Sequence, residues 1–313
     1  MLASDRIGRR LKLQDLNVLM TVVQAGSMRK AATLLNTSQP AISRSVADLE
    51  DAIGARLLDR NPQGVEPTEY GRALLDGGAA MFDELRLAVK NIECLADPTA
   101  GEVRIACNAI LATSFLAAVI DRVSRRHPRI AFHVVIRQAE LLHRELSERN
   151  VDLLITRQFG DLADERMEFE MLFVDAYVVA SGAHHPWARR HRIKLAQLVN
   201  EAWTLGPPDN ALGSVAREAF RASGLDYPHV TVVTASPEMR ISLLATGRFL
   251  SIFPEAILRF PTGRPGVKVL PVKVPVAPAP VGIVTLKNRT LSPVIKLFID
   301  HAREVAKPLA KRR

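Results

Sequence analysis

A group of hydrogen-bonding side chains stands at the start of a segment with helical periodicity, and its core is Gln39, Ser43 and Arg44. Apolar residues then recur every three or four positions, which predicts a helix with one buried face. These residues are Ile42, Val46, Leu49 and Ile53. Amide and guanidinium groups can bond bidentately to adenine and guanine edges in the major groove of DNA. The pattern therefore favours a helix that reads bases with its first turn.

Two preceding helices are predicted to hold this segment in place, at residues 13–25 and 28–35. The apolar face of the second would consist of Ala31, Ala32, Leu34 and Leu35. The polar break Asn36-Thr37-Ser38 supplies a turn and an N-cap. Pro40 fits the first turn of the next helix because its missing N–H loses no intrahelical bond. This is helix-turn-helix geometry, although a solvated three-helix core is equally compatible with the helical pattern alone.

The residues at and around this motif resemble the winged helix-turn-helix of LysR-type transcriptional regulators, a bacterial family. The matching positions keep a fixed spacing over about sixty residues, which is far more specific than one short motif. They are Leu13-Gln14-Asp15-Leu16, Gly26-Ser27, Ala31-Ala32-x-x-Leu35, Ser38-Gln39-Pro40-Ala41-x-Ser43-Arg44, Leu49-Glu50, Gly54, Leu57-Leu58-x-Arg60 and Pro67-Thr68-x-x-Gly71. The resemblance implies an all-α head with a wing, which forms a DNA-binding domain at residues 11–68.

Candidates for DNA contact fall into three groups. Gln39 and Arg44 suit base edges, and Pro40 suits a thymine methyl group. Phosphate contacts are expected from polar and cationic neighbours. These are Arg29, Lys30, Thr37, Ser38 and Ser43. Arg60 and Gln63 fall in a predicted two-stranded wing that ends near residue 65. There they could contact phosphate or the minor groove. For Arg60, the alternative is a salt bridge to Glu66 or Asp59.

A long amphipathic helix is predicted at residues 68–96, capped by Thr68 after Pro67. Its apolar steps alternate between three and four residues, which is typical of a coiled-coil seam. The seam consists of Leu74, Gly78, Met81, Leu85, Ala88, Ile92 and Leu95. In the family this helix pairs two subunits, because two recognition helices must reach both halves of a dyad operator. We therefore expect a linker helix at 69–97 and a homodimer or homotetramer.

From residue 101 the pattern alternates between strands and helices, which predicts parallel sheets with crossover helices. Strands are expected at 103–106, 130–136, 151–156 and 281–285, and helices at 114–126, 141–147 and 293–306. Further units, strand or helix unspecified, fall at 176–180, 195–199, 230–233, 237–245 and 249–253.

This half resembles the effector-binding domain of the same family, which is similar to periplasmic solute-binding proteins. The matching motifs are Gly101-Glu102-Val103-Arg104-Ile105, Arg126-His127-Pro128, Asn150-Val151-Asp152-Leu153, His185-Pro186-Trp187-Ala188 and Ser251-Ile252-Phe253-Pro254. The resemblance implies a two-lobed α/β domain at residues 101–305. Lobe I would span residues 101–167 and 270–305, and lobe II residues 168–269.

Ligands of such sheets bind where the carboxyl ends of the strands face a crevice. The candidates for effector contact at these ends are Asn108, Ile110, Gln138, Ala139, Arg157, Pro207 and Phe253. Arg157 and Asn108 suit a polar or anionic ligand. Relatives often place Ser or Thr where Ile110 and Ala139 stand, which weakens the carboxylate-binding pattern. Ordinary loop or packing chemistry is the alternative for each residue.

Composition and missing motifs argue against other classes of protein. The chain has 313 residues, enough for two or more domains, and its net charge of +9 favours a polyanionic partner. Two cysteines, Cys94 and Cys107, cannot form a disulfide framework or a zinc site. Neither a metal nor a cofactor is expected. No phosphate loop, dinucleotide fingerprint, HExxH or GxSxG motif occurs, which argues against an enzyme. The sequence shows no signal peptide or transmembrane run, which predicts a cytoplasmic bacterial protein without membrane contact.

The resemblance as a whole implies a sequence-specific regulator of transcription. It would bind double-stranded DNA at a dyad operator near a promoter, respond to a small-molecule effector and contact RNA polymerase. Two alternatives stay open at this point. One is a non-specific architectural DNA-binding protein, which a measured specificity ratio would distinguish. The other is a solute-binding protein, which would need a secretion signal and no DNA-binding head.

Overall fold

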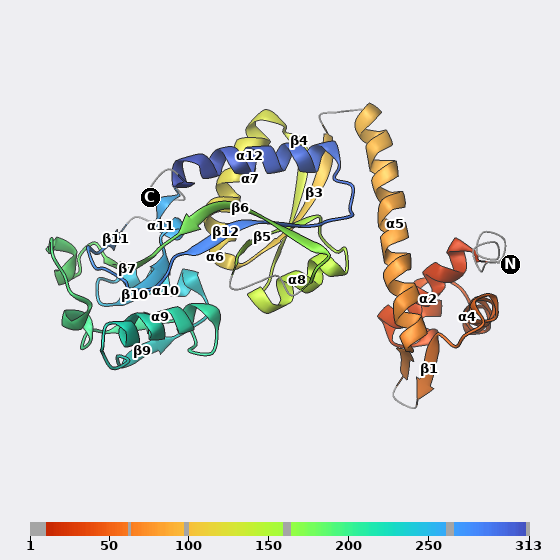
Figure 1. The fold of residues 1–313 in the computed structure, drawn as a ribbon, viewed down its shortest axis with the longest axis horizontal. Helices are drawn as coiled ribbons and strands as arrows, with labels where there is room; N and C mark the ends of the chain where they lie inside the picture. Colours follow the sequence, from red (N-terminus) through yellow and green to blue (C-terminus); the bar gives the residue numbers. More distant parts are fainter. Residues whose placement is uncertain (1–10, 62–63, 97–99, 159–163, 261–265, 311–313) are drawn as a thin grey trace. The chain divides into compact units, whose positions relative to one another are not determined.

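The computed structural model describes residues 11–61, 64–96, 100–158, 164–260 and 266–310 (Figure 1). The chain divides into two compact units, residues 1–88 and 89–313, and each is described by itself. The elements of the first unit are α2 (Leu13–Ala25), α3 (Met28–Leu34), α4 (Gln39–Ile53), β1 (Leu58–Asn61), β2 (Gly64–Pro67) and the start of α5 (Glu69–Ala96). The three predicted head helices are therefore confirmed to within one residue.

The core of the first unit lies between α2, α3 and α4. Its central side chains are fully or almost fully buried, and they include Leu19, Val22, Ala31, Val46 and Leu49. Two predicted core positions are wrong, because Leu34 is 69% exposed and Ile53 is 38% exposed. Leu34 lies roughly 100° around α3 from the face that carries Ala31 and Leu35. Ile53 is on the correct face but is the last residue of α4, where the other helices no longer cover it.

The turn before α4 fixes the direction of that helix. Asn36 takes a left-handed backbone conformation with φ of 53°, which asparagine tolerates better than most residues. Ser38 then caps α4, because its Oγ accepts a hydrogen bond from the backbone N–H of Ala41 at 3.3 Å. Pro40 stands in the first turn, as predicted.

The predicted wing is a two-stranded antiparallel sheet in which Leu58 pairs with Pro67 and Asn61 with Gly64. It extends to Pro67, slightly beyond the predicted end. Thr68 caps the next helix as predicted: its Oγ1 accepts from the N–H of Gly71 at 3.0 Å and donates to the carbonyl of Arg56 at 2.8 Å. The wing is therefore tied to the start of α5.

The apolar positions of α5 serve two different purposes. Leu74 packs against the head core, and a Cβ on Gly78 would lie 3.0 Å from the side chain of Leu16, so only glycine fits there without displacement. Further along the helix Leu87 is buried, whereas a row of four large apolar side chains is exposed. Met81, Leu85, Val89 and Ile92 are exposed by 40%, 51%, 49% and 66%. The side chain of Leu95 lies outside the described residues.

The second unit contains two five-stranded sheets. The first has the order β4 (Arg129–Ile136), β3 (Ala100–Cys107), β5 (Leu153–Arg157), β12 (Ala279–Leu286) and β6 (Met167–Asp175). The second has the order β11 (Val267–Val269), β7 (Tyr177–Gly182), β10 (Leu250–Pro254), β8 (Trp203–Leu205) and β9 (Val230–Val233).

The prediction of wholly parallel sheets is wrong, because both sheets are mixed. Strands β3, β4 and β5 are parallel, and so are β8, β9 and β10. Strand β12 runs antiparallel to β5, and β7 runs antiparallel to β10. Each of these two strands enters its sheet from the other lobe, and so runs opposite to the strands already there. Strand β6 stays in the first sheet up to Asp175 and β12 begins at Ala279, so both crossings come later than the predicted lobe limits near 168 and 270.

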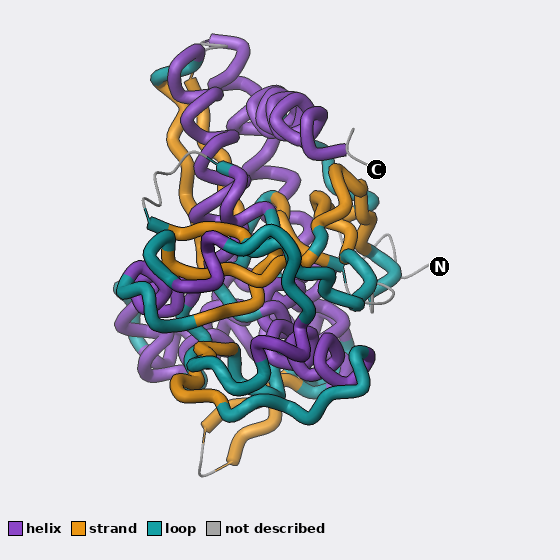
Figure 2. Tube along the Cα trace, turned by 90° about the vertical axis from the view of Figure 1, so that its left-hand side faces the viewer, coloured by secondary structure: helices purple, strands orange, loops and turns teal. Residues whose placement is uncertain are grey.

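Helices cover both faces of the first sheet. The α-helices of this unit are α6 (Ala109–Leu111), α7 (Ala117–Arg126), α8 (Ala139–Ser147), α9 (Ala211–Ala222), α10 (Pro237–Ala245), α11 (Ala256–Arg259) and α12 (Pro293–Ala310). A π-helical turn at Ala112–Leu116 joins α6 to α7, and 3₁₀ turns lie at Pro186–Arg189 and Leu195–Leu198. Helices α7 and α12 pack on one face of the sheet, and α8 packs on the other (Figure 1). Figure 2 shows the helices and strands of the chain from a second side, coloured by type.

Candidate functional sites

The start of α4 presents the predicted base-reading side chains to solvent. Gln39, Pro40 and Arg44 are all exposed. Ser43 is only half-buried, and its Oγ donates to the sulfur of Met28 at 3.3 Å. Ser43 is therefore partly used within the fold, whereas the other three are free to contact a ligand.

The predicted phosphate contacts surround this turn. Thr37 and Ser38 precede it, and Arg29 and Lys30 lie in the first turn of α3, and all four side chains are exposed. The chain between Ala25 and Ala47 contains no acidic residue. The surface at the start of α4 is thus suited to a polyanion.

Two carboxylates near α4 hold the head together and are not predicted from the sequence. Asp15 on α2 is buried and accepts a hydrogen bond from Ser45 Oγ on α4. Glu50 accepts from the backbone N–H groups of Leu57 at 2.7 Å and Leu58 at 3.3 Å, which fixes the start of the wing. Both carboxylates therefore accept hydrogen bonds from groups of the head itself.

The wing residues give less information. Arg60 lies in β1, and its backbone pairs with Val65 across the wing. Its side chain and the whole of Gln63 lie outside the described residues. The choice between DNA contact and a salt bridge for Arg60 therefore stays a prediction.

The candidate effector residues follow the carboxyl ends of the parallel strands, where the two lobes meet. Ile110, from the first lobe, is 4% exposed and belongs to one apolar cluster with Phe249 and Phe253 of the second. Asn108 caps α6, because its Oδ1 accepts from the N–H of Leu111 at 3.0 Å, but its side chain is only half-buried. The junction between the lobes thus has an apolar interior with polar groups beside it.

Two predicted effector residues have a partner inside the fold. Arg157 is 5% exposed and forms an ion pair with Asp175. Asp175 also accepts from the backbone N–H of Ala256 at 2.9 Å, so the pair joins β5, β6 and α11. Phe253 is fully buried. Arg157 is thus already paired and Phe253 lies in the interior of the fold, so the contact of either residue with an effector stays a prediction.

The remaining candidates lie at the ends of the strands. Gln138 is exposed just before α8, and its side chain makes no capping bond. Pro207 is half-buried after β8, and its carbonyl accepts from the N–H of Asn210 at 3.1 Å. Ala139 is the first residue of α8, but its side chain lies outside the described residues. Asn108, Gln138 and Pro207 are therefore the predicted residues that the structure leaves accessible.

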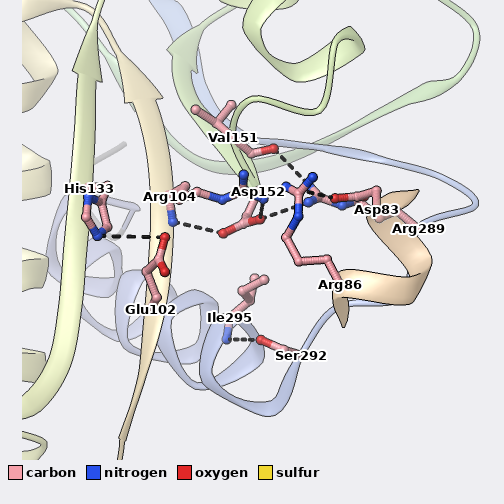
Figure 3. A network of polar contacts seen from close by, with 10 residues as sticks. All are labelled: Asp83, Arg86, Glu102, Arg104, His133, Val151, Asp152, Arg289, Ser292 and Ile295. Atoms are coloured by element: carbon pink, nitrogen blue, oxygen red, sulfur yellow. Dashed lines mark hydrogen bonds and ion pairs between the residues drawn. The ribbon is translucent and has the colours of Figure 1, made fainter. Parts of the chain in front are cut away.

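A buried network centred on Asp152 holds the first lobe together (Figure 3). The Asp152 carboxylate accepts from the backbone N–H of Arg104 and from the Nη2 atoms of Arg104 and Arg289, each at 2.8 Å. Arg289 also donates through Nη1 to the carbonyl of Val151 at 2.7 Å. Sequence spacing gives no signal for the pair with Arg289, which is separated from Asp152 by 137 residues.

We interpret Cys107 as a small buried packing residue rather than a redox sensor, because free cysteines are among the most frequently buried residues. Its side chain is fully buried in the core of the first lobe, and burial raises the pKa of the thiol to about 12. Because the thiolate is the reactive form, the raised pKa lowers the reactive fraction at neutral pH about 10³-fold relative to an ordinary cysteine. In a Cys94→Ser background, we expect Cys107 to react with a thiol reagent only after unfolding. Rapid modification of the folded protein, or DNA binding that peroxide alters through Cys107, would contradict this interpretation.

Comparisons with known proteins agree with these two parts of the chain. The family pattern described as "Bacterial regulatory helix-turn-helix protein, lysR family" matches residues 13–72. The pattern of the LysR substrate binding domain matches residues 96–307, which is more than half of the chain. The chain belongs to the LysR family. It is thus a LysR-type transcriptional regulator with a helix-turn-helix domain and an effector-binding domain, and the match over both parts argues against a plain solute-binding protein.

Individual relatives span nearly the whole chain. The HTH-type transcriptional regulator GbpR of Azospirillum brasilense is 27% identical over 287 residues, which cover 91% of this chain and 83% of the relative. The transcriptional dual regulator GltC of Bacillus subtilis (strain 168) is 25% identical over 294 residues, covering 93% and 96%.

Solved structures share the fold of this LysR-family chain. A full-length variant of OxyR from Pseudomonas aeruginosa has a TM-score of 0.67 at 21% identity, covering 97% of this chain and 99% of that one. CbnR in complex with its target DNA has a TM-score of 0.54 at 20% identity, covering 95% and 100%. Within the described part of this chain, no helix combines the length and apolar character needed to cross a bilayer.

Proposed function

We propose that this LysR-family regulator reads an interrupted dyad operator near a promoter with the first turn of α4 from two subunits. The observation that carries the proposal is the exposure of Gln39, Pro40 and Arg44 on a turn that has no acidic neighbour between Ala25 and Ala47. Gln39 and Arg44 have the donors and acceptors to read adenine and guanine, and Pro40 can contact a thymine methyl group. Arg29, Lys30, Thr37 and Ser38 serve the phosphates.

The other parts of the chain have separate roles in this proposal. Residues 11–68 form the DNA-binding head, which includes Ser43, Arg60 and Gln63 as further contacts, and 69–97 form the linker. Residues 101–305 bind the effector, with Asn108, Gln138 and Pro207 as the accessible contacts. The regulator acts in the bacterial cytoplasm, where operator DNA and RNA polymerase are found. A non-specific architectural role would need none of the base-reading side chains on α4.

The apolar stripe on α5 supports the pairing of two subunits. Met81, Leu85, Val89 and Ile92 are 40–66% exposed on one helix. A row of large apolar side chains at steps of three and four is the pattern that buries itself against a second helix. Two copies of α5 therefore form the seam of a homodimer, from which a tetramer can be built.

Leu85→Glu is expected to weaken this dimer by at least about 100-fold, because it would bury two unpaired carboxylates in an apolar seam. Analytical ultracentrifugation of the full-length protein measures the dissociation constant. Arg72→Glu is the matched control, since Arg72 is exposed on the opposite side of α5. An unchanged dimer in Leu85→Glu would show that the subunits pair elsewhere.

A small-molecule effector regulates the protein only if it favours one arrangement of the lobes over another. Thermal-shift screening of metabolites, followed by operator footprinting with each hit, tests this proposal. We expect at least one hit to change the protected pattern on an interrupted dyad upstream of a target gene. Hits that stabilise the protein without changing any footprint would argue against effector control.

A further inference from the structure

A buried arginine in the second lobe forms no ion pair with any described residue. Arg240, in the first turns of α10, is 1% exposed. Its Nη1 donates to the carbonyl of Ile252 at 3.4 Å, and its guanidinium carbon lies 4.5 Å from the centroid of the Phe253 ring. Its Nε has no hydrogen-bond partner among the described residues.

Two other buried arginines of this chain form ion pairs with buried aspartates. Arg157 pairs with Asp175, and Arg289 pairs with Asp152. In the described ranges Arg240 forms no ion pair. Glu238, two residues earlier, is exposed and accepts a hydrogen bond from Ser236 Oγ at 3.0 Å. Burial lowers the pKa of Arg240 to about 10, so its side chain is still charged at neutral pH.

Arg240 stands at the edge of the second sheet that faces the first lobe. Strands β8, β9 and β10 are parallel, so their carboxyl ends share one edge, and α10 begins just after β9. The ring of Phe253, at the end of β10, belongs to the same apolar cluster as Ile110 of the first lobe. The guanidinium that stacks on this ring is therefore close to the junction where effectors of two-lobed α/β domains bind.

A second unpartnered polar group lies on the same face of the sheet. Trp203 and Leu205 belong to the core on one face of β8, so Thr204 between them points to the other face, which α10 covers. Thr204 is fully buried, and its Oγ1 has no hydrogen-bond partner in the described part of the chain. A buried hydroxyl without a hydrogen-bond partner and a buried cation without an ion-pair partner both cost stability.

We propose that Arg240 binds an oxyanion of the effector (a carboxylate, sulfate or phosphate group) and that Thr204 donates a hydrogen bond to the same ligand. This inference rests on the proposed effector-binding function of the domain. A guanidinium offers paired donors to an oxyanion, and the ligand would supply a directly bonded negative charge in addition to the electrostatic effect of Glu238, which raises the pKa of Arg240. The anion would therefore be bound by residues of the second lobe. This is consistent with the first lobe, where Ile110 and Ala139 stand at positions at which relatives often have Ser or Thr.

The test is thermal unfolding of the full-length protein in sodium sulfate and in sodium chloride at equal ionic strength. Sulfate stabilises most proteins by exclusion from their surface, so the informative quantity is the difference between variants. We expect the sulfate-minus-chloride shift in Tm to be larger by about 2–4 °C in the wild type than in Arg240→Met. Arg240→Lys should keep part of the difference, because it keeps the charge.

Arg248→Met is the matched control, since Arg248 also lies over a phenylalanine ring, 5.6 Å from the centroid of Phe249, but is exposed. It should respond to sulfate like the wild type. In chloride alone, Arg240→Met should melt above the wild type, because an unpaired buried charge has been removed. A lower Tm there would contradict an uncompensated charge.

Equal sulfate responses in the wild type and Arg240→Met would overturn the inference. Operator binding is measured on the same proteins, to separate this failure from a failure of the proposed function. If the wild-type protein binds its operator but shows no sulfate response that depends on Arg240, the proposed function is retained and the anion site is rejected. Wild-type protein that binds no operator removes the proposed function itself.

Discussion

Arg44→Ala is expected to remove the preference for operator DNA while leaving the fold and the oligomeric state intact. The Arg44 side chain is exposed, so its loss leaves no cavity. A bidentate contact to guanine is worth about 1–3 kcal/mol of discrimination, and a dyad uses two copies of it. The ratio of operator affinity to random-duplex affinity should therefore fall by about 30-fold to 10⁴-fold in a binding titration at fixed salt.

Arg29→Ala is the control for this experiment, because Arg29 is an exposed cation in the same head but is assigned to phosphate. It should weaken binding to operator and random duplex alike and lower the slope of log affinity against log salt by about 1 per contact. If Arg44→Ala behaved in this uniform way and kept its sequence preference, Arg44 would be a phosphate contact and not a base reader.

Asp152→Ala is expected to destabilise the effector-binding unit more than any surface change. Asp152 is 1% exposed and carries the charges of Arg104 and Arg289. Removing one partner from a buried ion pair costs about 3–5 kcal/mol, and the Asp152 carboxylate accepts three hydrogen bonds of this network. Denaturant unfolding of the full-length protein should show this loss in the transition of the effector-binding unit. Asp152→Asn keeps one acceptor oxygen and should lose less; a loss below about 1 kcal/mol in Asp152→Ala would contradict the role of the network.

The same carboxylate gives the unit a defined response to acid. Burial raises the pKa of Asp152. The hydrogen bonds from Arg104 and the positive charges of Arg104 and Arg289 lower it by more than burial raises it, so the pKa of Asp152 lies below its usual value. The folded state thus binds its proton less readily than the unfolded state. The stability contributed by Asp152 is present at neutral pH and is lost as the pH falls through the folded-state pKa. Asp152→Asn should reduce this part of the acid dependence.

The head was predictable from the sequence because its determinants are local. Ser38 caps α4 from three residues away, and Asn36 and Pro40 specify the turn and the first helical residues within a short window. Leu34 and Ile53 are predicted to be buried but are exposed. A helical pattern gives the spacing of apolar residues, but it does not show whether another element packs over a given side chain. In α5 the same apolar spacing holds Leu74 against the core of its own chain and leaves Leu85 exposed.

The effector-binding unit was predicted less completely, because its structure depends on pairings distant in sequence. Strand β6 was missed, and its place in the first sheet is set by pairing with β12, more than one hundred residues later. For the same reason the sequence could place Arg157 at the end of a strand but could not show that Asp175 neutralises it. Arg240 gives no signal in the sequence, since only the fold shows that it is buried and that no described residue forms an ion pair with it.

The most direct measurement of the central claim is a competition between the protein's own upstream region and a random duplex of equal length, at one fixed salt concentration. If the first turn of α4 reads bases from two paired subunits, the upstream region should bind at least about 10³-fold more tightly. A ratio near one, with and without candidate metabolites, would contradict the account.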